Sequence, residues 1–306
     1  MSDRKFYRRF ILLTEIASEL DEGEFIKISS PMTVEFEITR NNLAKVNEAS
    51  FTVYNLGEDT RNEIYKDVWN INDQRAVQFF AGYAEKVGDL LPCCFTGTIR
   101  RAYSHRQGTE VRTVIEAFDG NVSLGMPTNG ITLPARTPLP VVIDTLAKGM
   151  TGVDKVTVGT MLPVLAQRAT AMFGDPMEKL SQLTNNGFYI DSGAAYALGP
   201  KDVLQGEIIL IDKNNGLIGT PKKSEVMVEI EMLFEPRLKP SQYIELKSET
   251  EPRFNGDYKV TGLIHRGTIS NAICGDCRSI VTLQRLDESS LVYDPVTLEY
   301  RTIEHD

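Results

Sequence analysis

The 306-residue sequence predicts a mainly β protein in which a small mixed α/β segment separates two strand-rich regions. The first observation is an alternation of apolar and polar residues in several short stretches, which is typical of half-buried strands. The second is the close spacing of these stretches, with turn residues between them, which indicates a barrel or a sandwich. The third is a change after Gly125, where prolines and helix-start signals become frequent.

The first strand-rich region covers about 125 residues. Val34, Phe36 and Ile38 alternate with polar residues and give a strand one apolar face. A helical stretch is expected over 58–66, and the spacer 104–108 has the glycine and polar residues of a hairpin loop. Further strands are expected at 51–54, 76–83, 95–103 and 111–118.

The middle segment, from about residue 126 to 205, is predicted to contain two short helices and a strand. Thr137 can cap a helix whose first residue is a proline, and apolar residues follow at helical spacing. Asp175 can cap the second helix, with Glu178 three residues later as a capping box requires. A short strand is expected at 188–190.

Strands return from about residue 206. Asn255-Gly256 is typical of a tight turn between two strands. The stretch 228–232 resembles 34–38, because both alternate apolar residues with glutamates. Two barrels of related architecture would produce this likeness, and so would any two half-buried strands, so both explanations stay open. The strands expected in this region are 226–232, 243–246, 258–265 and 280–286.

Composition argues against several classes of function. The chain carries 33 Lys and Arg against 42 Asp and Glu, a net charge of −9, whereas a nucleic-acid binder needs a basic face. No apolar run approaches the roughly 18 residues of a membrane-spanning helix. The apolar stretch 10–13 is followed at once by acidic residues, so it does not form a secretory signal. We therefore expect a chain that folds in a reducing cytoplasm and does not insert into membranes.

No set of residues indicates catalysis. The histidines, His105, His265 and His305, lack metal-ligand spacing, and the sequence has no phosphate loop, dinucleotide fingerprint or nucleophile elbow. We predict no catalytic, cofactor-binding or metal-binding residue. One alternative is a carbohydrate-binding module, which needs clustered aromatic residues, but the single tryptophan is Trp69. Another is a zinc or thiol enzyme that uses Cys93, Cys94, Cys274 and Cys277.

Two groups of short motifs carry a family likeness, and their shared order makes it specific. The motifs are Phe51-Thr52-Val53-Tyr54-Asn55-Leu56-Gly57, Ala81-Gly82-Tyr83, Phe95-Thr96-Gly97-Thr98-Ile99 and Phe118-Asp119-Gly120, then Phe234-Glu235-Pro236-Arg237-Leu238-Lys239-Pro240, Asn255-Gly256-Asp257-Tyr258 and His265-Arg266-Gly267. In this order they resemble the baseplate hub proteins of contractile-tailed bacteriophages, the tail hub or late control protein D-like family. The likeness covers most of residues 30–286 and involves turn and packing positions, so it carries over no catalytic residue.

The resemblance implies two similar tube-type β-barrel domains that flank a small mixed α/β domain. We expect residues 1–125 to form the first barrel, 126–205 the middle domain and 206–286 the second barrel. Residues 287–306 would form an acidic C-terminal arm, because carboxylates outnumber basic residues there. This arm is either a frayed tail or a segment that docks on a neighbouring protomer or on a spike, and both explanations stay open.

The function that the resemblance implies is structural. Such hubs form homotrimers whose six barrels match a sixfold tail tube on one side and a threefold central spike on the other. DNA would cross the channel as transient cargo during ejection, and tail tube or tube-initiator, tape-measure and baseplate-wedge proteins are further candidate partners. The protein would belong to the tail baseplate of a virion, assembled in the host cytoplasm, without enzymatic activity or cofactor. The nearest alternative is the hub of a related contractile injection system, such as a secretion-system spike or a bacteriocin.

Overall fold

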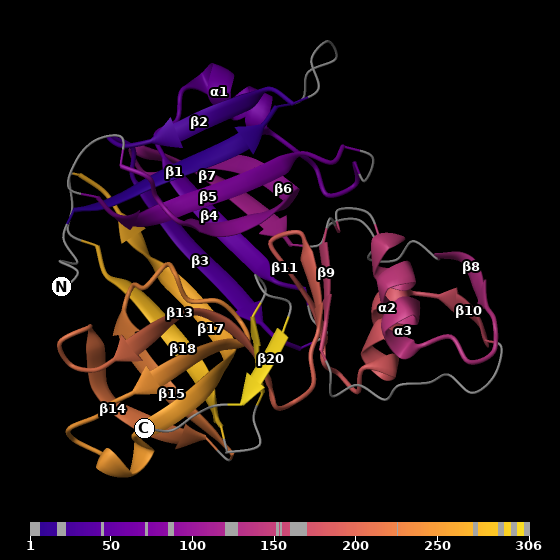
Figure 1. Ribbon diagram of the computed structural model, residues 1–306. Helices are drawn as coiled ribbons and strands as arrows, with labels where there is room; N and C mark the ends of the chain where they lie inside the picture. Colours follow the sequence, from indigo (N-terminus) through magenta and orange to yellow (C-terminus); the bar gives the residue numbers. More distant parts are fainter. Residues whose placement is uncertain are drawn as a thin grey trace.

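The computed structural model of the chain is mostly β, as the sequence predicts (Figure 1). A large twisted sheet occupies the left part of the view, and a smaller unit of helices and short strands projects from its side. The structure describes residues 7–16, 23–43, 46–70, 73–84, 89–119, 128–150, 153, 155–159, 170–224, 226–271, 275–286, 291–294 and 299–302.

The N-terminal strands form the first half of the large sheet. Their spatial order is β2-β1-β5-β6-β7-β4-β3, and each neighbouring pair is antiparallel. Buried and exposed side chains alternate along β3, as its sequence predicts. The elements are β1 (Arg8–Glu15), β2 (Phe25–Ser29), β3 (Val34–Asn41), β4 (Glu48–Tyr54), α1 (Glu58–Ile64), β5 (Ala76–Tyr83), β6 (Cys93–Gln107) and β7 (Glu110–Phe118).

The hairpin between β6 and β7 is tighter than the sequence analysis expects. Residues 104–107 extend β6 instead of forming a loop, and the turn consists of Gly108 and Thr109, with Gly108 at φ +64°. Ser104 lies opposite Thr113, and their hydroxyl oxygens are 2.9 Å apart. The polar composition of this stretch therefore reflects an exposed strand and not a loop.

The middle unit contains short strands and two helices. Asp175 caps α3 as predicted, because its Oδ1 accepts a hydrogen bond from the backbone N–H of Met177 at 2.9 Å. Thr137 does not cap α2: its hydroxyl donates to the carbonyl of Pro134, and the helix begins after Pro138. The elements are β8 (Thr128–Leu133), α2 (Leu139–Lys148), β9 (Lys155–Val158), β10 (Thr170–Gly174), α3 (Pro176–Leu183), β11 (Phe188–Asp191) and β12 (Ala194–Ala197).

The C-terminal strands form the second half of the large sheet. Asn255-Gly256 is not a two-residue turn here: β17 begins at Gly256, and the Asn255 side chain accepts from the backbone N–H of Ser248 at 2.6 Å, which closes a longer loop. The elements are β13 (Asp202–Ile211), β14 (Leu217–Ser224), β15 (Met227–Leu233), β16 (Gln242–Leu246), a 3-10 turn (Pro252–Phe254), β17 (Gly256–Ile269), β18 (Cys277–Arg285), β19 (Leu291–Asp294) and β20 (Glu299–Thr302).

The described strands of the second half repeat the strand order of the first half. The spatial orders are β3-β4-β7-β6-β5-β1 and β14-β15-β18-β17-β16-β13, and both follow the chain in the same relative sequence. One direction differs, since β13 is parallel to β16 whereas β1 is antiparallel to β5. The likeness between 34–38 and 228–232 joins strands that do not correspond, because β15 takes the place of β4. It therefore reflects alternation common to half-buried strands.

The two halves are joined edge to edge in one 15-stranded sheet. β3 pairs with the far part of β17, from Asn41 opposite Gly262 to Val34 opposite Ile269. Among the described strands no pairing closes either half separately, so the expected barrels are present as twisted halves of a continuous sheet. At the other end, β19 runs parallel to β13 of the same chain and pairs with β20. Docking of the C-terminal arm on another chain stays a prediction.

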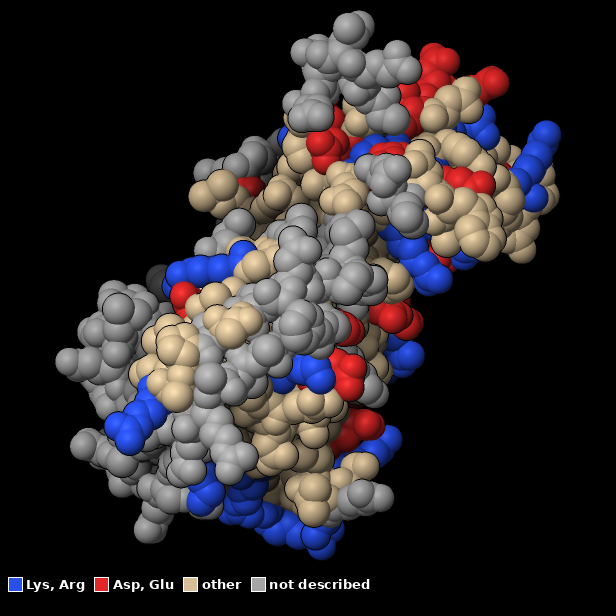
Figure 2. Space-filling view, turned by 90° about the vertical axis from the view of Figure 1, so that its right-hand side faces the viewer, with Lys and Arg blue, Asp and Glu red and all other residues tan. Residues whose placement is uncertain are grey.

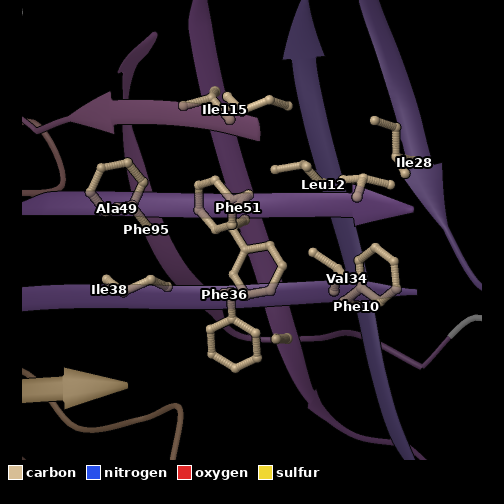
Figure 3. Packing of buried hydrophobic residues seen from close by; sticks show 14 of the residues in the cluster. Phe10, Leu12, Ile28, Val34, Phe36, Ile38, Ala49, Phe51, Phe95 and Ile115 are labelled. Atoms are coloured by element: carbon tan, nitrogen blue, oxygen red, sulfur yellow. The ribbon is translucent and has the colours of Figure 1, made fainter. Parts of the chain in front are cut away.

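Each half and the middle unit have their own hydrophobic cluster. In the first cluster, the ring of Phe79 lies 4.8 Å from that of Phe51 and 5.1 Å from that of Phe36. Figure 3 shows Phe36 and Phe51 in this cluster, on the neighbouring strands β3 and β4. Phe234 follows β15 of the second half, yet it packs in this first cluster, with its ring 5.5 Å from Phe36. The Tyr83 hydroxyl donates to the Phe234 carbonyl at 3.0 Å. This side chain therefore ties the second half to the core of the first.

We expect Phe234→Ala to lower the free energy of unfolding by about 3–5 kcal/mol, because it leaves a cavity between the two halves. Phe234 is fully buried, whereas its neighbour Leu233 is 41% exposed. Leu233→Ala is therefore the matched control and should cost about 1 kcal/mol or less. Denaturant unfolding followed by circular dichroism measures both, and equal losses for the two variants would contradict this account of Phe234.

Candidate functional site

A buried arginine lies where the two sheet halves and the middle unit meet. Arg40 is in β3 on the same face as Val34, Phe36 and Ile38, so the strand period places its charge inside the molecule, where it is 2% exposed. Its guanidinium forms a bidentate ion pair with Asp191, with Nε–Oδ1 at 2.8 Å and Nη2–Oδ2 at 2.5 Å. Such paired geometry fixes both direction and distance.

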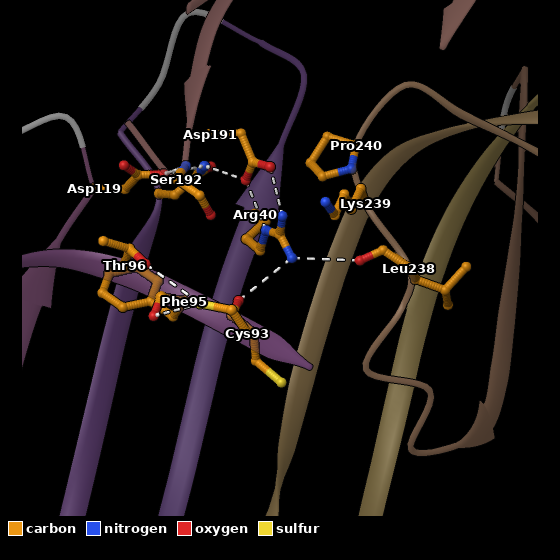
Figure 4. A network of polar contacts seen from close by, with 12 residues as sticks. Arg40, Cys93, Phe95, Thr96, Asp119, Asp191, Ser192, Leu238, Lys239 and Pro240 are labelled. Carbon is orange, nitrogen blue, oxygen red and sulfur yellow. Dashed lines mark hydrogen bonds and ion pairs between the residues drawn. The ribbon is translucent and has the colours of Figure 1, made fainter. Parts of the chain in front are cut away.

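This ion pair connects three parts of the chain (Figure 4). Arg40 comes from the first half of the sheet, and Asp191 ends β11 of the middle unit. The third nitrogen, Nη1, donates to the carbonyl of Leu238, in the loop after β15 of the second half, at 3.3 Å. It also lies 3.4 Å from the carbonyl of Cys94 in β6. One side chain thus contacts all three units, and we call this place the junction.

A second carboxylate, Asp119, stands beside the junction. Its Oδ2 accepts from the backbone N–H of Ser192 at 2.5 Å, and its Oδ1 from that of Gly193 at 3.4 Å. Both donors belong to the turn between β11 and β12, where Ser192 and Gly193 have φ of 52° and 77°. The Asn47 amide donates to the Ile190 carbonyl at 2.9 Å. Asp119 and Asn47, both from the first half, therefore hold this turn of the middle unit.

Burial and the neighbouring charge of Asp191 raise the pKa of Asp119 to about 6. Two carboxylates and one guanidinium share this buried place, so one carboxylate lacks a full counter-charge. The backbone N–H groups of Ser192 and Gly193, with the amide of Asn47, partly stabilise the ionised form. The junction therefore holds an acid that titrates above its ordinary range.

A buried lysine makes a second attachment between the middle unit and the second half. Lys259 in β17 is 2% exposed, and its ammonium donates to the carbonyls of Gly199 at 3.2 Å and Pro200 at 3.4 Å. Burial lowers the pKa of Lys259 to about 8, although the charge of Asp202 opposes this shift. A groove of about 460 Å³ lies beside it, lined by Asn42, Asn186, Tyr189, Leu198, Lys259 and Thr282 among others.

The cysteines do not form a reactive centre in the described residues. Cys94 is fully buried, and burial raises the pKa of its thiol to about 12, while burial also raises the pKa of the Cys277 thiol. The sulfur of Cys93 lies 3.3 Å from the hydroxyl of Thr96. Cys274 lies outside the described residues. Where the structure describes the chain, no three His, Cys, Asp or Glu side chains form a group that could hold a metal ion.

The two described histidines lie in strands of the large sheet, and the tryptophan lies in a loop. His265 is buried, with its Nδ1 2.8 Å from the Ser279 hydroxyl, and burial lowers its pKa to about 3. His105 is exposed in β6, and Trp69 is 87% exposed in the loop after α1. His305 lies outside the described residues. Arg40 is not predicted as a site residue from the sequence, although a charged residue on the apolar face of an alternating strand indicates a buried ion pair.

The outer face of the sheet is polar where the two halves join. A groove of about 430 Å³ there is lined by residues of both halves, among them Glu35, Glu37, Arg266, Asp276 and Arg278. Arg278 lies 2.7 Å from carboxylate oxygens of both Glu231 and Asp276. Figure 2, which draws the right-hand side of Figure 1, shows acidic and basic side chains close to one another in several places on that face. Among the described helices, none has the length and apolar character to cross a membrane.

We expect Arg40→Met to lower the free energy of unfolding by about 3–5 kcal/mol, because it leaves Asp191 buried without its counter-charge. Lys213→Met is the matched control, since the Lys213–Glu249 pair is exposed and should contribute about 1 kcal/mol or less. Adding Asp191→Leu to Arg40→Met should restore part of the loss. Thermal and denaturant unfolding measure these changes, and a neutral Arg40→Met would contradict the role of the junction.

The pKa of Asp119 predicts a dependence of stability on pH. Because its folded-state pKa of about 6 exceeds the ordinary 3.8, the folded chain holds this proton between those values and the unfolded chain does not. The resulting stability is fully present below about pH 4 and is lost as the pH rises through about 6. Lowering the pH from 7 to 5 should therefore stabilise the chain by about 1 kcal/mol through this group.

Asp119→Asn isolates this contribution, because other groups titrate equally in both chains. The variant should lose the gain on going from pH 7 to pH 5, as measured by urea unfolding at each pH. The same gain in the variant and in the wild type would assign the effect to another residue.

Comparison with solved structures shows the same fold in three tail or secretion proteins of low sequence identity. The 43 kDa tail protein of prophage MuSo2 from Shewanella oneidensis has a TM-score of 0.58 at 10% identity, covering 90% of this chain and 98% of that one. The tail protein from Neisseria meningitidis MC58 has a TM-score of 0.54 at 8% identity, covering 90% and 96%. The E. coli c3393 protein, a component of the type VI secretion system, has a TM-score of 0.55 at 11% identity, covering 90% and 78%.

Sequence comparison gives the family. No curated protein matches the chain by sequence. The family model described as baseplate hub gp41 matches residues 13–266, which is more than half of the chain. This range includes β2 to β16 and most of β17, and with them the middle unit and the junction, whereas β18 lies beyond it. The protein therefore belongs to the baseplate hub gp41 family.

Proposed function

We propose that the protein is a homotrimeric adaptor in a phage baseplate, joining a sixfold tail tube to a threefold central spike. Membership of the baseplate hub family supports the hub role. The observation that carries the adaptor role is the repeated strand order of the two sheet halves, β3-β4-β7-β6-β5-β1 and β14-β15-β18-β17-β16-β13. Three copies of a chain with two such halves present six similar units around one axis.

The junction supports this role, because an adaptor must keep its two halves at a fixed angle under load. Arg40 contacts all three units from a position that water does not reach, and Phe234 fills the first core from the second half. A buried ion pair permits only a narrow range of geometries, whereas an exposed linker would permit many. The two halves would then move as one body when the tail contracts.

The polar face of the sheet supports a channel that conducts DNA. Around the groove between the halves, carboxylates outnumber arginines, and Arg278 is engaged by Glu231 and Asp276. A face of this kind offers phosphates few free positive charges, so DNA would pass as transient cargo without being held. We place this face toward the channel and propose no enzymatic activity for it.

The domain division follows from the same proposal. Residues 1–125 and 206–286 would be the two hub domains, 126–205 the middle domain, and 287–306 an arm available to a neighbouring protomer or to the spike. The protein would reside in the baseplate of the virion after assembly in the host cytoplasm. Its partners would be the spike, the tail tube or its initiator, and the tape-measure and wedge proteins.

A second candidate is the hub of another contractile injection machine. The E. coli c3393 protein, which has this fold, is a component of the type VI secretion system. In that setting the same trimer would cap a secretion tube, and no DNA would pass. The genes that neighbour this one would separate the two settings, since capsid and packaging genes accompany a phage hub only.

Light scattering coupled to size-exclusion chromatography tests the adaptor. We expect a three-copy species for the protein alone or with its spike, and the Lys213→Met variant should behave in the same way because that side chain forms only an exposed ion pair. A stable monomer under both conditions, at micromolar concentration, would contradict the trimer and with it the adaptor.

A further inference from the structure

The repeat in the sheet relates two pairs of strand edges. Within one chain, the edge strand β3 of the first half pairs with the far part of β17 of the second half. The counterpart of β3 in the second half is β14, and the counterpart of β17 in the first half is β6. If the arrangement between the halves repeats around an axis, β14 of one chain faces β6 of the next chain.

β6 and β17 correspond in detail and not only in order. They are the longest strands of their halves, with 15 and 14 residues. Each has one extra residue opposite its hairpin partner: Arg100 lies between the pairs Ile99–Ala117 and Arg101–Glu116, and Thr261 lies between Val260–Leu283 and Gly262–Thr282. Aligning the two bulges superimposes residues 101–108 on 262–269, which are the residues of β17 that pair with β3.

The corresponding part of β6 has one edge without a strand partner. On one side, residues 101–107 pair with β7 throughout. On the other side, β5 ends its pairing at Thr98, and the one isolated bridge joins Ala102 to Lys66. Within the described part of the chain, residues 103–107 therefore have no strand on that edge, and 104–107 are exposed.

The outer edge of β14 likewise has no partner among the described strands. Its pairing among the described strands is with β15 alone. Lys222, Lys223 and Ser224 at its end are exposed. Lysines on an edge disfavour pairing with unrelated strands, so this edge can stay unpaired in a monomer and still pair with one specific partner.

We propose that β14 of one copy pairs antiparallel with residues 103–107 of β6 in a second copy. This would repeat, between chains, the β3–β17 strand pairing found within the chain. The partner is thus another copy of this protein, and the copy number rests on the proposed trimer. Backbone hydrogen bonds across this edge would continue the sheet from chain to chain, and in a closed ring they would cover the outer edge of β14 and the open edge of residues 103–107 in every copy.

The register of this pairing follows from the ladders. In the first half, Ala117 of β7 faces Ala49 of β4, and Ala49 faces Ile38 of β3. In the second half, Leu283 of β18 faces Val228 of β15, and Val228 faces Lys223 of β14. Lys223 therefore corresponds to Ile38.

The opposite residues on β6 follow from β17. Ile38 faces His265 of β17, which corresponds to Ser104 of β6, so Lys223 of one copy lies opposite Ser104 of the next. One residue along, Lys222 lies opposite His105. Each interchain pairing is short, because β14 has its own bulge between Ile218 and Lys222. A single pairing of this length would be weak, and closure of the ring makes the contacts cooperative.

A cysteine pair tests both the edge and its register in the full-length chain. His105→Cys combined with Lys222→Cys places the two thiols on directly opposite residues of neighbouring copies, within reach of a disulfide after small adjustments. Mild oxidation with copper phenanthroline should then give covalently linked copies, visible by non-reducing electrophoresis, at least tenfold more than in either single variant. The single variants also report any linkage through the native cysteines.

The matched control keeps His105→Cys and moves the second thiol two residues along the same face, as Ser224→Cys. Diagonal neighbours are about 7–8 Å apart, so this pair should link poorly. A trimer by light scattering in which the His105–Lys222 pair does not link would overturn the strand pairing and leave the hub intact. Equal linking in the Ser224 control would overturn the register, and a monomer at every concentration would overturn both the pairing and the proposed trimer.

Discussion

The ion pair between Arg40 and Asp191 is the constraint on which the architecture depends. It lies on the side of β3 that otherwise carries apolar residues, and it is reached by the turn of the middle unit and by the loop that follows β15. A buried ion pair adds little net stability, since desolvation of the two charges opposes their attraction. The ion pair instead fixes the orientation of the three units, because the guanidinium must reach both Asp191 and the Leu238 carbonyl at once.

The two halves of the large sheet that this ion pair holds together are similar but not identical. The halves share a strand order and a bulge in their longest strand, yet they differ in the direction of β13 relative to β16 and in the strands that flank them, β2 in one half and β19 in the other. Similar halves can occupy similar places in a ring, while the differences leave each half with its own outer contacts. These features suit the proposed adaptor, which would contact sixfold and threefold neighbours through different surfaces.

Much of the fold could be predicted from the sequence, because alternation is local. The strand around Val34, the cap at Asp175 and the mainly β class all follow from neighbouring residues. The predictions were wrong where residues distant in the sequence determine the local structure. Residues 104–107 continue β6 because β7 pairs with them, and the Asn255 side chain closes a loop by accepting a hydrogen bond from Ser248. The junction could be anticipated only in part. Arg40 at an apolar phase signals a buried charge, but its partner Asp191 is 151 residues away, and no local pattern connects them.

Electron microscopy of the purified assembly, viewed along its axis, tests the central claim most directly. Rigidly held, repeated halves predict a ring of six similar lobes around an open channel, with the middle units projecting as a threefold set from its side. A particle with three single lobes, or one without a central opening, would contradict the account.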